Sequence, residues 1–194
     1  MSEQETFAGI PVLTFDSAEK WNSWLAVNHG DQLGVWIKIA KKHSGIQSIT
    51  HLEALDEALC YGWIDGMRRG HDDTAFLQKF TPRRAKSSWS KVNIGKVETL
   101  IVAGRMKPQG QAEIDRAKAD GRWDAAYESQ ANATIPDDFA AELEKSDAAK
   151  AFYESLTKAE KYAALWQLMT AKSPATRSTR LRTIVTKLAL RQKP

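Results

Sequence analysis

The stretch WIDGMRRGHDDTAFLQKFTPR, residues 63–83, decides the fold class because it predicts a β-hairpin. Two strand-like runs flank the polar turn residues Gly70 to Asp73. If the first strand is regular, Trp63, Asp65 and Met67 share one of its faces. The carboxylate at Asp65 is unusual between two large apolar side chains, and we return to it below.

The residues before the hairpin predict further mixed structure. GVWIKIA, residues 34–40, alternates in the manner of a strand. Thr50 and Glu53 form a capping box for a helix whose Leu52, Leu55 and Leu59 we expect to face inward. Asp16 is the expected N-cap of an earlier helix. Together with the hairpin, these elements predict a small, mostly antiparallel sheet packed with helices.

The residues after the polar stretch QANATIP, 130–136, predict only helices. We expect Phe139 and Leu143 to be buried, a capping box at Thr157 and Glu160, and a last helix over 174–191. The predicted architecture is therefore α+β, with a core domain over 1–128 and a helical subdomain packed on it over 129–194.

The formal charge of +4 is unevenly distributed over the 194 residues. Residues 172–193 contain seven Lys or Arg and no acid, whereas residues 1–171 carry 21 basic and 24 acidic residues, a formal charge of −3. This local basicity indicates an anionic partner or an ordinary solvated helix face. The N-terminus lacks a signal-like pattern and no stretch is as long as a membrane span, so we expect a cytoplasmic protein.

The sequence contains none of the common catalytic or nucleotide-binding motifs. The four histidines do not pair at zinc-ligand spacing, and the single cysteine, Cys60, is expected to be buried and inert. The turn at His71, Asp72 and Asp73 could hold a metal weakly, but polar turns need no metal. We therefore expect no cofactor, no structural metal and a non-enzymatic role.

A basic segment with a single tryptophan, FTPRRAKSSWSKVN, follows the second strand at residues 80–93. Free backbone N–H groups at a helix start, together with arginines, can bind an anion, and an aromatic ring can stack on it. Alternatively, the tryptophan packs inward, Ser90 caps the helix and the cations are solvated. The candidate anion-binding residues are Arg83, Arg84, Lys86, Trp89, Ser90, Lys91 and Asn93.

Asp65 belongs to the same candidate site, together with Arg105. If the carboxylate is buried, it needs a cationic partner, and Arg83 or Arg105 is expected to supply it. This pair either braces the loop or forms one wall of a ligand pocket around Asp65, Arg83 and Trp89.

The last helix carries an apolar stripe of Leu181, Ile184, Val185 and Leu188. We expect this stripe to be docked. Arg180, Lys187 and Arg191 should form an outward basic ridge, with Arg182 on the opposite flank. Arg177 lies at the edge of the stripe and can reach inward. Arg177 and Arg180 complete the candidate anion-binding residues.

Five stretches taken together resemble the YdeI/OmpD-associated family, also called the bacteriocin-protection family. They are EALCYGWIDG (57–66), FTPRRAKSSWSKVN (80–93), LIVAGRMKPQGQAEIDRAKADGRWDAAY (100–127), IPDDF (135–139) and WQLMTAKSPATRSTRLRTIV (166–185). The resemblance covers nearly the whole chain, from Trp21 to the last helix. The motif residues that it carries over are Trp63, Asp65, Pro82, Arg83, Ser88, Trp89, Ser90, Asn93, Arg105, Trp123, Thr176, Arg177 and Arg180.

The resemblance implies a bacterial α+β protein linked by name to antimicrobial resistance and to an outer-membrane porin. It implies no reaction, cofactor or catalytic residue. We therefore expect a non-enzymatic stress protein that binds an anionic molecule or phosphate through the basic loop and the last helix. The alternatives are a small-ligand-binding protein or enzyme and, less favoured, a nucleic-acid-binding module. Any porin association is expected to be indirect.

Overall fold

The computed structural model describes residues 5–30 and 33–194, and the chain divides into two compact units. The first unit comprises Met1–Ser87 and Asn93–Asp124, and the second comprises Ser88–Val92 and Ala125–Pro194. Each unit therefore takes residues from the basic segment 80–93.

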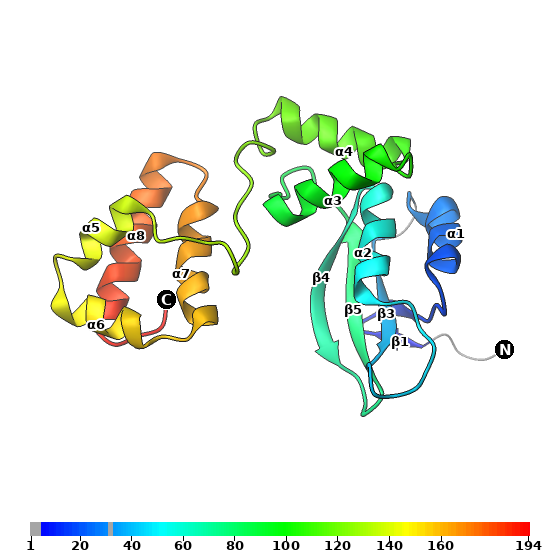
Figure 1. Cartoon of the computed structure of the whole chain (residues 1–194), viewed down its shortest axis with the longest axis horizontal. Helices are drawn as coiled ribbons and strands as arrows, with labels where there is room; N and C mark the ends of the chain where they lie inside the picture. Colours follow the sequence, from blue (N-terminus) through cyan, green and yellow to red (C-terminus); the bar gives the residue numbers. More distant parts are fainter. Residues whose placement is uncertain (1–4, 31–32) are drawn as a thin grey trace. The chain divides into compact units, whose positions relative to one another are not determined.

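A five-stranded sheet forms the base of the first unit (Figure 1), and its strand order is β1-β2-β3-β5-β4. Neighbouring strands are antiparallel except for β2 and β3, which are parallel. The expected hairpin is confirmed as β4 and β5, and the α+β class is confirmed. The strands are β1 (Thr6–Phe7), β2 (Ile10–Leu13), β3 (Val35–Ala40), β4 (Trp63–Gly70) and β5 (Ala75–Pro82).

The hairpin contains a β-bulge that the alternation pattern did not predict. Asp65 is opposite Phe80, and Arg68 is opposite Gln78, so β4 uses one more residue than β5 between these pairs. An extra residue reverses the facing of the side chains that follow it. Met67 is accordingly 56% exposed whereas Trp63 is buried, and the prediction that the two share one face is wrong.

Helices α1 (Ala18–Asn28) and α2 (His51–Cys60) pack together in the first unit, and α2 runs along the sheet (Figure 1). The buried Trp21 donates its indole N–H to the carbonyl of Ala54 at 3.0 Å and so ties α1 to α2. Gly62, with a φ of 74°, then turns the chain from α2 into β4, in a conformation that favours glycine. Helices α3 (Lys91–Val102) and α4 (Pro108–Ala119) follow the hairpin.

Three expectations about the starts of these helices have different outcomes. The capping box of Thr50 and Glu53 is confirmed. Ser17 rather than Asp16 caps α1, because the Asp16 carboxylate pairs with Lys20 instead. Leu52 is 61% exposed, so the expectation that it faces inward is wrong.

Four helices enclose the core of the second unit: α5 (Asp137–Leu143), α6 (Asp147–Ser155), α7 (Lys158–Met169) and α8 (Pro174–Ala189). Phe139, Leu143, Ile184 and Leu188 are buried there, as expected. Leu181 and Val185 are partly buried against the same core, so the docked stripe of the last helix is confirmed. The capping box of Thr157 and Glu160 is also confirmed, and Ser173 caps α8.

Candidate functional site

The first part of the basic segment, residues 83–87, lies in the first unit. Arg83 is buried, and its backbone amide donates to the carbonyl of Gly62 at 2.9 Å. Arg84 and Ser87 form a turn in which the Ser87 amide donates to the Arg84 carbonyl at 2.9 Å. The side chains of Arg84 and Lys86 are exposed, so these two cations are accessible to an anion.

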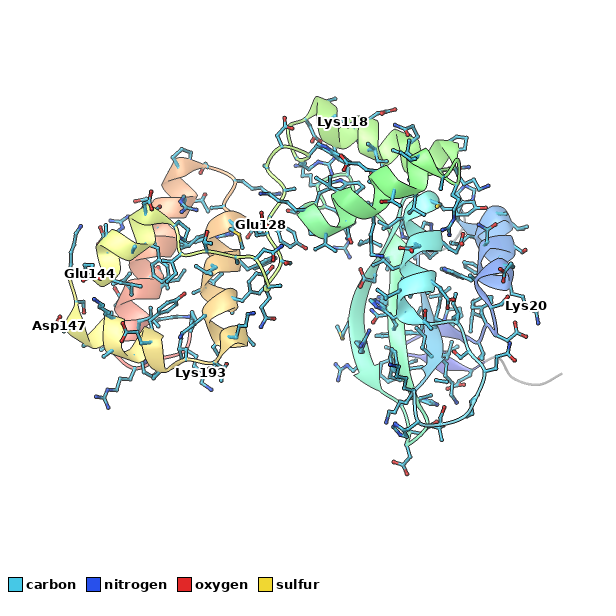
Figure 2. The ribbon with its side chains drawn as sticks, in the orientation of Figure 1. Lys20, Lys118, Glu128, Glu144, Asp147 and Lys193 are labelled. Carbon is cyan, nitrogen blue, oxygen red and sulfur yellow. The ribbon has the colours of Figure 1, made fainter. Side chains whose placement is uncertain are left out.

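The second part of the segment, residues 88–92, lies in the second unit. Trp89 is only 2% exposed, which agrees with the packing alternative rather than with a ring that stacks on a ligand. Ser90 is also buried. Lys91 forms an ion pair of 2.5 Å with Glu128, which Figure 2 labels in the segment between α4 and α5. Asn93, in the first turn of α3, is half-buried and belongs to the first unit.

Asp65 bonds to a histidine. Its Oδ2 lies 3.0 Å from Nε2 of His51, the first residue of α2. The Asp65 side chain is 28% exposed, so the prediction of a fully buried carboxylate is wrong. The sequence reasoning missed His51 because it considered histidines only at zinc-ligand spacing. The signal that could have found it was its position directly after the N-cap Thr50.

Arg105 pairs with Glu57 of α2, at 2.5 Å between Nη2 and Oε1, and this corrects its predicted pairing with Asp65. The Glu57 side chain is only 10% exposed, and its Oε2 accepts a bond of 2.6 Å from Asn22 of α1. The hydroxyl of Tyr61 donates to Asn22 at 3.3 Å. These bonds connect α1, α2 and the segment before α4, so the arrangement braces the first unit. Glu57 was missed, although it is the acid on the buried side of α2.

Arg177 reaches inward from α8, as the sequence allowed. Its Nε and Nη2 bind both oxygens of Asp138 at 2.8 and 2.7 Å, and its Nη1 donates to the carbonyl of Leu168 at 2.9 Å. The guanidinium of Arg177 lowers the pKa of the Asp138 carboxyl. Leu168 is in the last turn of α7, whose final carbonyls lack helical partners. Arg177 therefore holds three helices together.

Arg180 has a similar structural role. Its Nη1 donates to the carbonyl of Gln167 at 2.7 Å, and its side chain is half-buried. The prediction that Arg180 belongs to an outward ridge is therefore wrong. A cation placed at the C-terminus of α7 satisfies free carbonyls and interacts favourably with the helix dipole.

The outer face of α8 carries exposed cations that, unlike Arg177 and Arg180, do not bond to α7 in the described structure. A shallow groove of about 460 Å³ is lined by Thr179, Arg182, Thr183, Thr186, Lys187, Leu190 and Gln192. Within the described ranges, no carboxylate pairs with Arg182, Lys187 or Arg191, and all three side chains are exposed. Lys193, labelled in Figure 2, differs because it pairs with Glu160 at 2.6 Å. Arg182, placed on the opposite flank by the sequence analysis, is thus part of this basic face.

Three remaining features concern metal, thiol and membrane chemistry. In the turn after β4, Asp72 accepts bonds from the backbone of Thr74 and Ala75, and in the described part of the chain no group of three metal-ligating side chains comes together. Burial raises the pKa of the Cys60 thiol to about 11, so the thiolate is disfavoured. None of the described helices combines the length and apolarity needed to span a membrane.

Comparison with known families divides the chain in two. Residues 13–113 match a domain of unknown function, DUF8412, and residues 132–190 match the family described as bacteriocin-protection, YdeI or OmpD-associated. No curated protein and no solved structure matches the chain. The resemblance seen in the sequence is confirmed over α5 to α8, whereas a different family model covers strands β3, β4 and β5. The chain therefore belongs to the DUF8412 family, and its C-terminal helices are similar to the family described as bacteriocin-protection, YdeI or OmpD-associated.

Proposed function

We propose that this protein acts in bacteriocin protection as a binding protein that holds an anionic, phosphate-bearing partner on the outer face of α8. The match over 132–190 suggests the bacteriocin-protection-like role at the family level. The observation that carries the finer proposal is the groove flanked by Arg182 and Lys187, two exposed cations without a carboxylate partner in the described part of the chain.

The chemistry of this face suits phosphate oxygens. Thr179 and Thr186 place hydroxyl groups along the groove, and Arg182 can donate two parallel hydrogen bonds. The sequence contains no Asp or Glu after Glu160, so no acid on α8 itself opposes an anion. Because Ile184 and Leu188 are buried in the core, the helix presents this face without rearrangement.

The experiment compares wild type with the double variant Arg182→Glu/Lys187→Glu. Binding is measured to vesicles containing phosphatidylglycerol, to a single-stranded oligonucleotide and to inorganic phosphate, which separates a lipid headgroup, a nucleic acid and a free anion. We expect at least one of the three to bind wild type, with an affinity that falls with salt and drops about tenfold or more in the variant.

The loop site predicted from the sequence is the competing location. Arg84→Glu/Lys86→Glu makes the same change of charge in the first unit and serves as the matched control. Unchanged binding in the α8 variant together with weakened binding in the loop variant would contradict the proposal. Failure of all three probes to bind wild type would also contradict it.

A further inference from the structure

An apolar groove lies within the first unit, between the segment after β3, the start of α2 and strand β5. Its volume is about 490 Å³, within the range of small-molecule sites. It is lined by Ile39, Ala40, Lys41, Lys42, Gly45, Ile46, Ser48, Ile49, Thr50, His51, Leu52 and Phe76. Two of these, Ile46 and Leu52, are 57% and 61% exposed.

The lining of this groove contains cations but no carboxylate. None of the twelve lining residues is acidic, whereas Lys41 and Lys42 are cationic. Lys41 donates to the carbonyl of Asp72 at 2.8 Å, and Asp65 holds Nε2 of His51 at 3.0 Å. Lys42 is exposed. The groove therefore combines an apolar lining with two lysines, and the bond to the Asp72 carbonyl fixes the orientation of Lys41.

The groove is formed before any ligand arrives. Ser48 accepts a bond of 3.2 Å from the amide of Ala40 and donates to the carbonyl of Ile49 at 3.0 Å, so the segment is tied to the end of β3. Ile49 is buried beneath it. A groove held in place by such bonds requires little ordering on binding, which favours affinity.

We propose that this groove binds a small amphiphilic anion, with an apolar chain or ring against Ile46, Leu52 and Phe76 and a carboxylate directed towards Lys42. Charge complementarity selects this class, since a cationic amphiphile would meet like charges at the rim. The site is independent of the outer face of α8, because it lies wholly in the first unit. No residue of the predicted loop site lines it.

The test uses sodium decanoate, below its micelle concentration, as the probe and follows backbone amide shifts of the full chain by NMR. Decyltrimethylammonium has a similar chain with the opposite charge and is the matched ligand control. We expect decanoate to shift the amides of Ile46, Leu52 and Phe76 and to bind at least about tenfold more tightly than the cation.

Two variants address the two halves of the proposal. Leu52→Glu removes apolar contact and adds a negative charge, and it should weaken decanoate binding at least about tenfold. The variant should still fold, because Leu52 is exposed and an acid in the first turn of α2 is favourable. Lys42→Glu should weaken binding about fivefold or more. Val27→Glu, at a 77% exposed position of α1, is the control and should bind as wild type does.

Three results would overturn the proposal: no saturable shift with decanoate, equal affinity for decanoate and the cation, or equal losses in Leu52→Glu and Val27→Glu. None of these results bears on the α8 surface, so the two proposals fail separately.

Discussion

Two basic segments of this chain, residues 80–93 and helix α8, look alike in sequence and differ in the structure. In the first segment, Arg83 is buried and Lys91 pairs with Glu128. In α8, Arg177 and Arg180 bind backbone carbonyls of α7, while Arg182 and Lys187 stay exposed on the other side. Density of charge in the sequence therefore does not identify an anion site.

The two segments show that some cations stabilise the fold and are therefore not available to a ligand. The last carbonyls of a helix need donors, and an arginine on a neighbouring helix can supply several at once. Arg177 and Arg180 do this for α7, and both are among the four arginines that the family resemblance carries over. These two arginines are thus explained by helix packing, and the candidate binding surface consists of their exposed neighbours Arg182 and Lys187.

The largest expected effect concerns the aromatic residue of the first segment. Trp89→Ala removes a side chain that is 2% exposed, so we expect a loss of about 3–5 kcal/mol in the free energy of unfolding, measured by urea denaturation. Trp166→Ala, at a tryptophan 44% exposed, is the control and should cost much less. Equal losses would show that Trp89 is not a core residue.

Substitution of Arg177 should lower the free energy of unfolding by less than Trp89→Ala does. Arg177→Gln loses the paired bonds to Asp138 and should destabilise the second unit by about 1–3 kcal/mol at neutral pH. This range allows for solvent screening of the ion pair, because the Asp138 side chain is 43% exposed. Lys145→Gln breaks an exposed pair with Glu142 and should cost about 0–1 kcal/mol.

The Arg177 effect should depend on pH. Arg177 depresses the pKa of Asp138 below its ordinary value of 3.8, so the stabilisation is complete above that value and is lost as pH falls through the lowered pKa. The difference in stability between wild type and Arg177→Gln should therefore shrink in acid. If this difference in stability stays constant between neutral pH and a pH of about 2, the stabilisation by Arg177 comes from its bond to Leu168 and not from the ion pair.

Substitution of Asp65 should cause the smallest loss in the free energy of unfolding. From the sequence, removal of a buried charge partner would cost about 3–5 kcal/mol. Because Asp65 is 28% exposed and bonds to His51, Asp65→Asn should cost only about 0.5–1.5 kcal/mol in thermal or urea unfolding. A loss above about 3 kcal/mol would indicate that the buried-charge interpretation was the better one.

Local patterns predicted the fold better than they predicted the site. Capping boxes, the hairpin and the stripe of α8 depend on residues close in sequence, and they were confirmed. The bulge after Asp65 was not predictable, because its register depends on pairing with β5. The partners of Arg105 and Asp65 depend on how α2 lies on the sheet, which no local pattern specifies.

The central claim is that the exposed cations of α8, rather than those of the loop, bind an anionic partner. Its most direct test uses whichever of the three probes binds wild type and measures the affinity of wild type, Arg182→Gln/Lys187→Gln and Arg84→Gln/Lys86→Gln from about 50 mM to about 500 mM salt. The account predicts that wild type and the loop variant bind alike and lose affinity steeply with salt, while the α8 variant binds weakly with little salt dependence. Equal binding by all three proteins, or loss of binding in the loop variant alone, would contradict it.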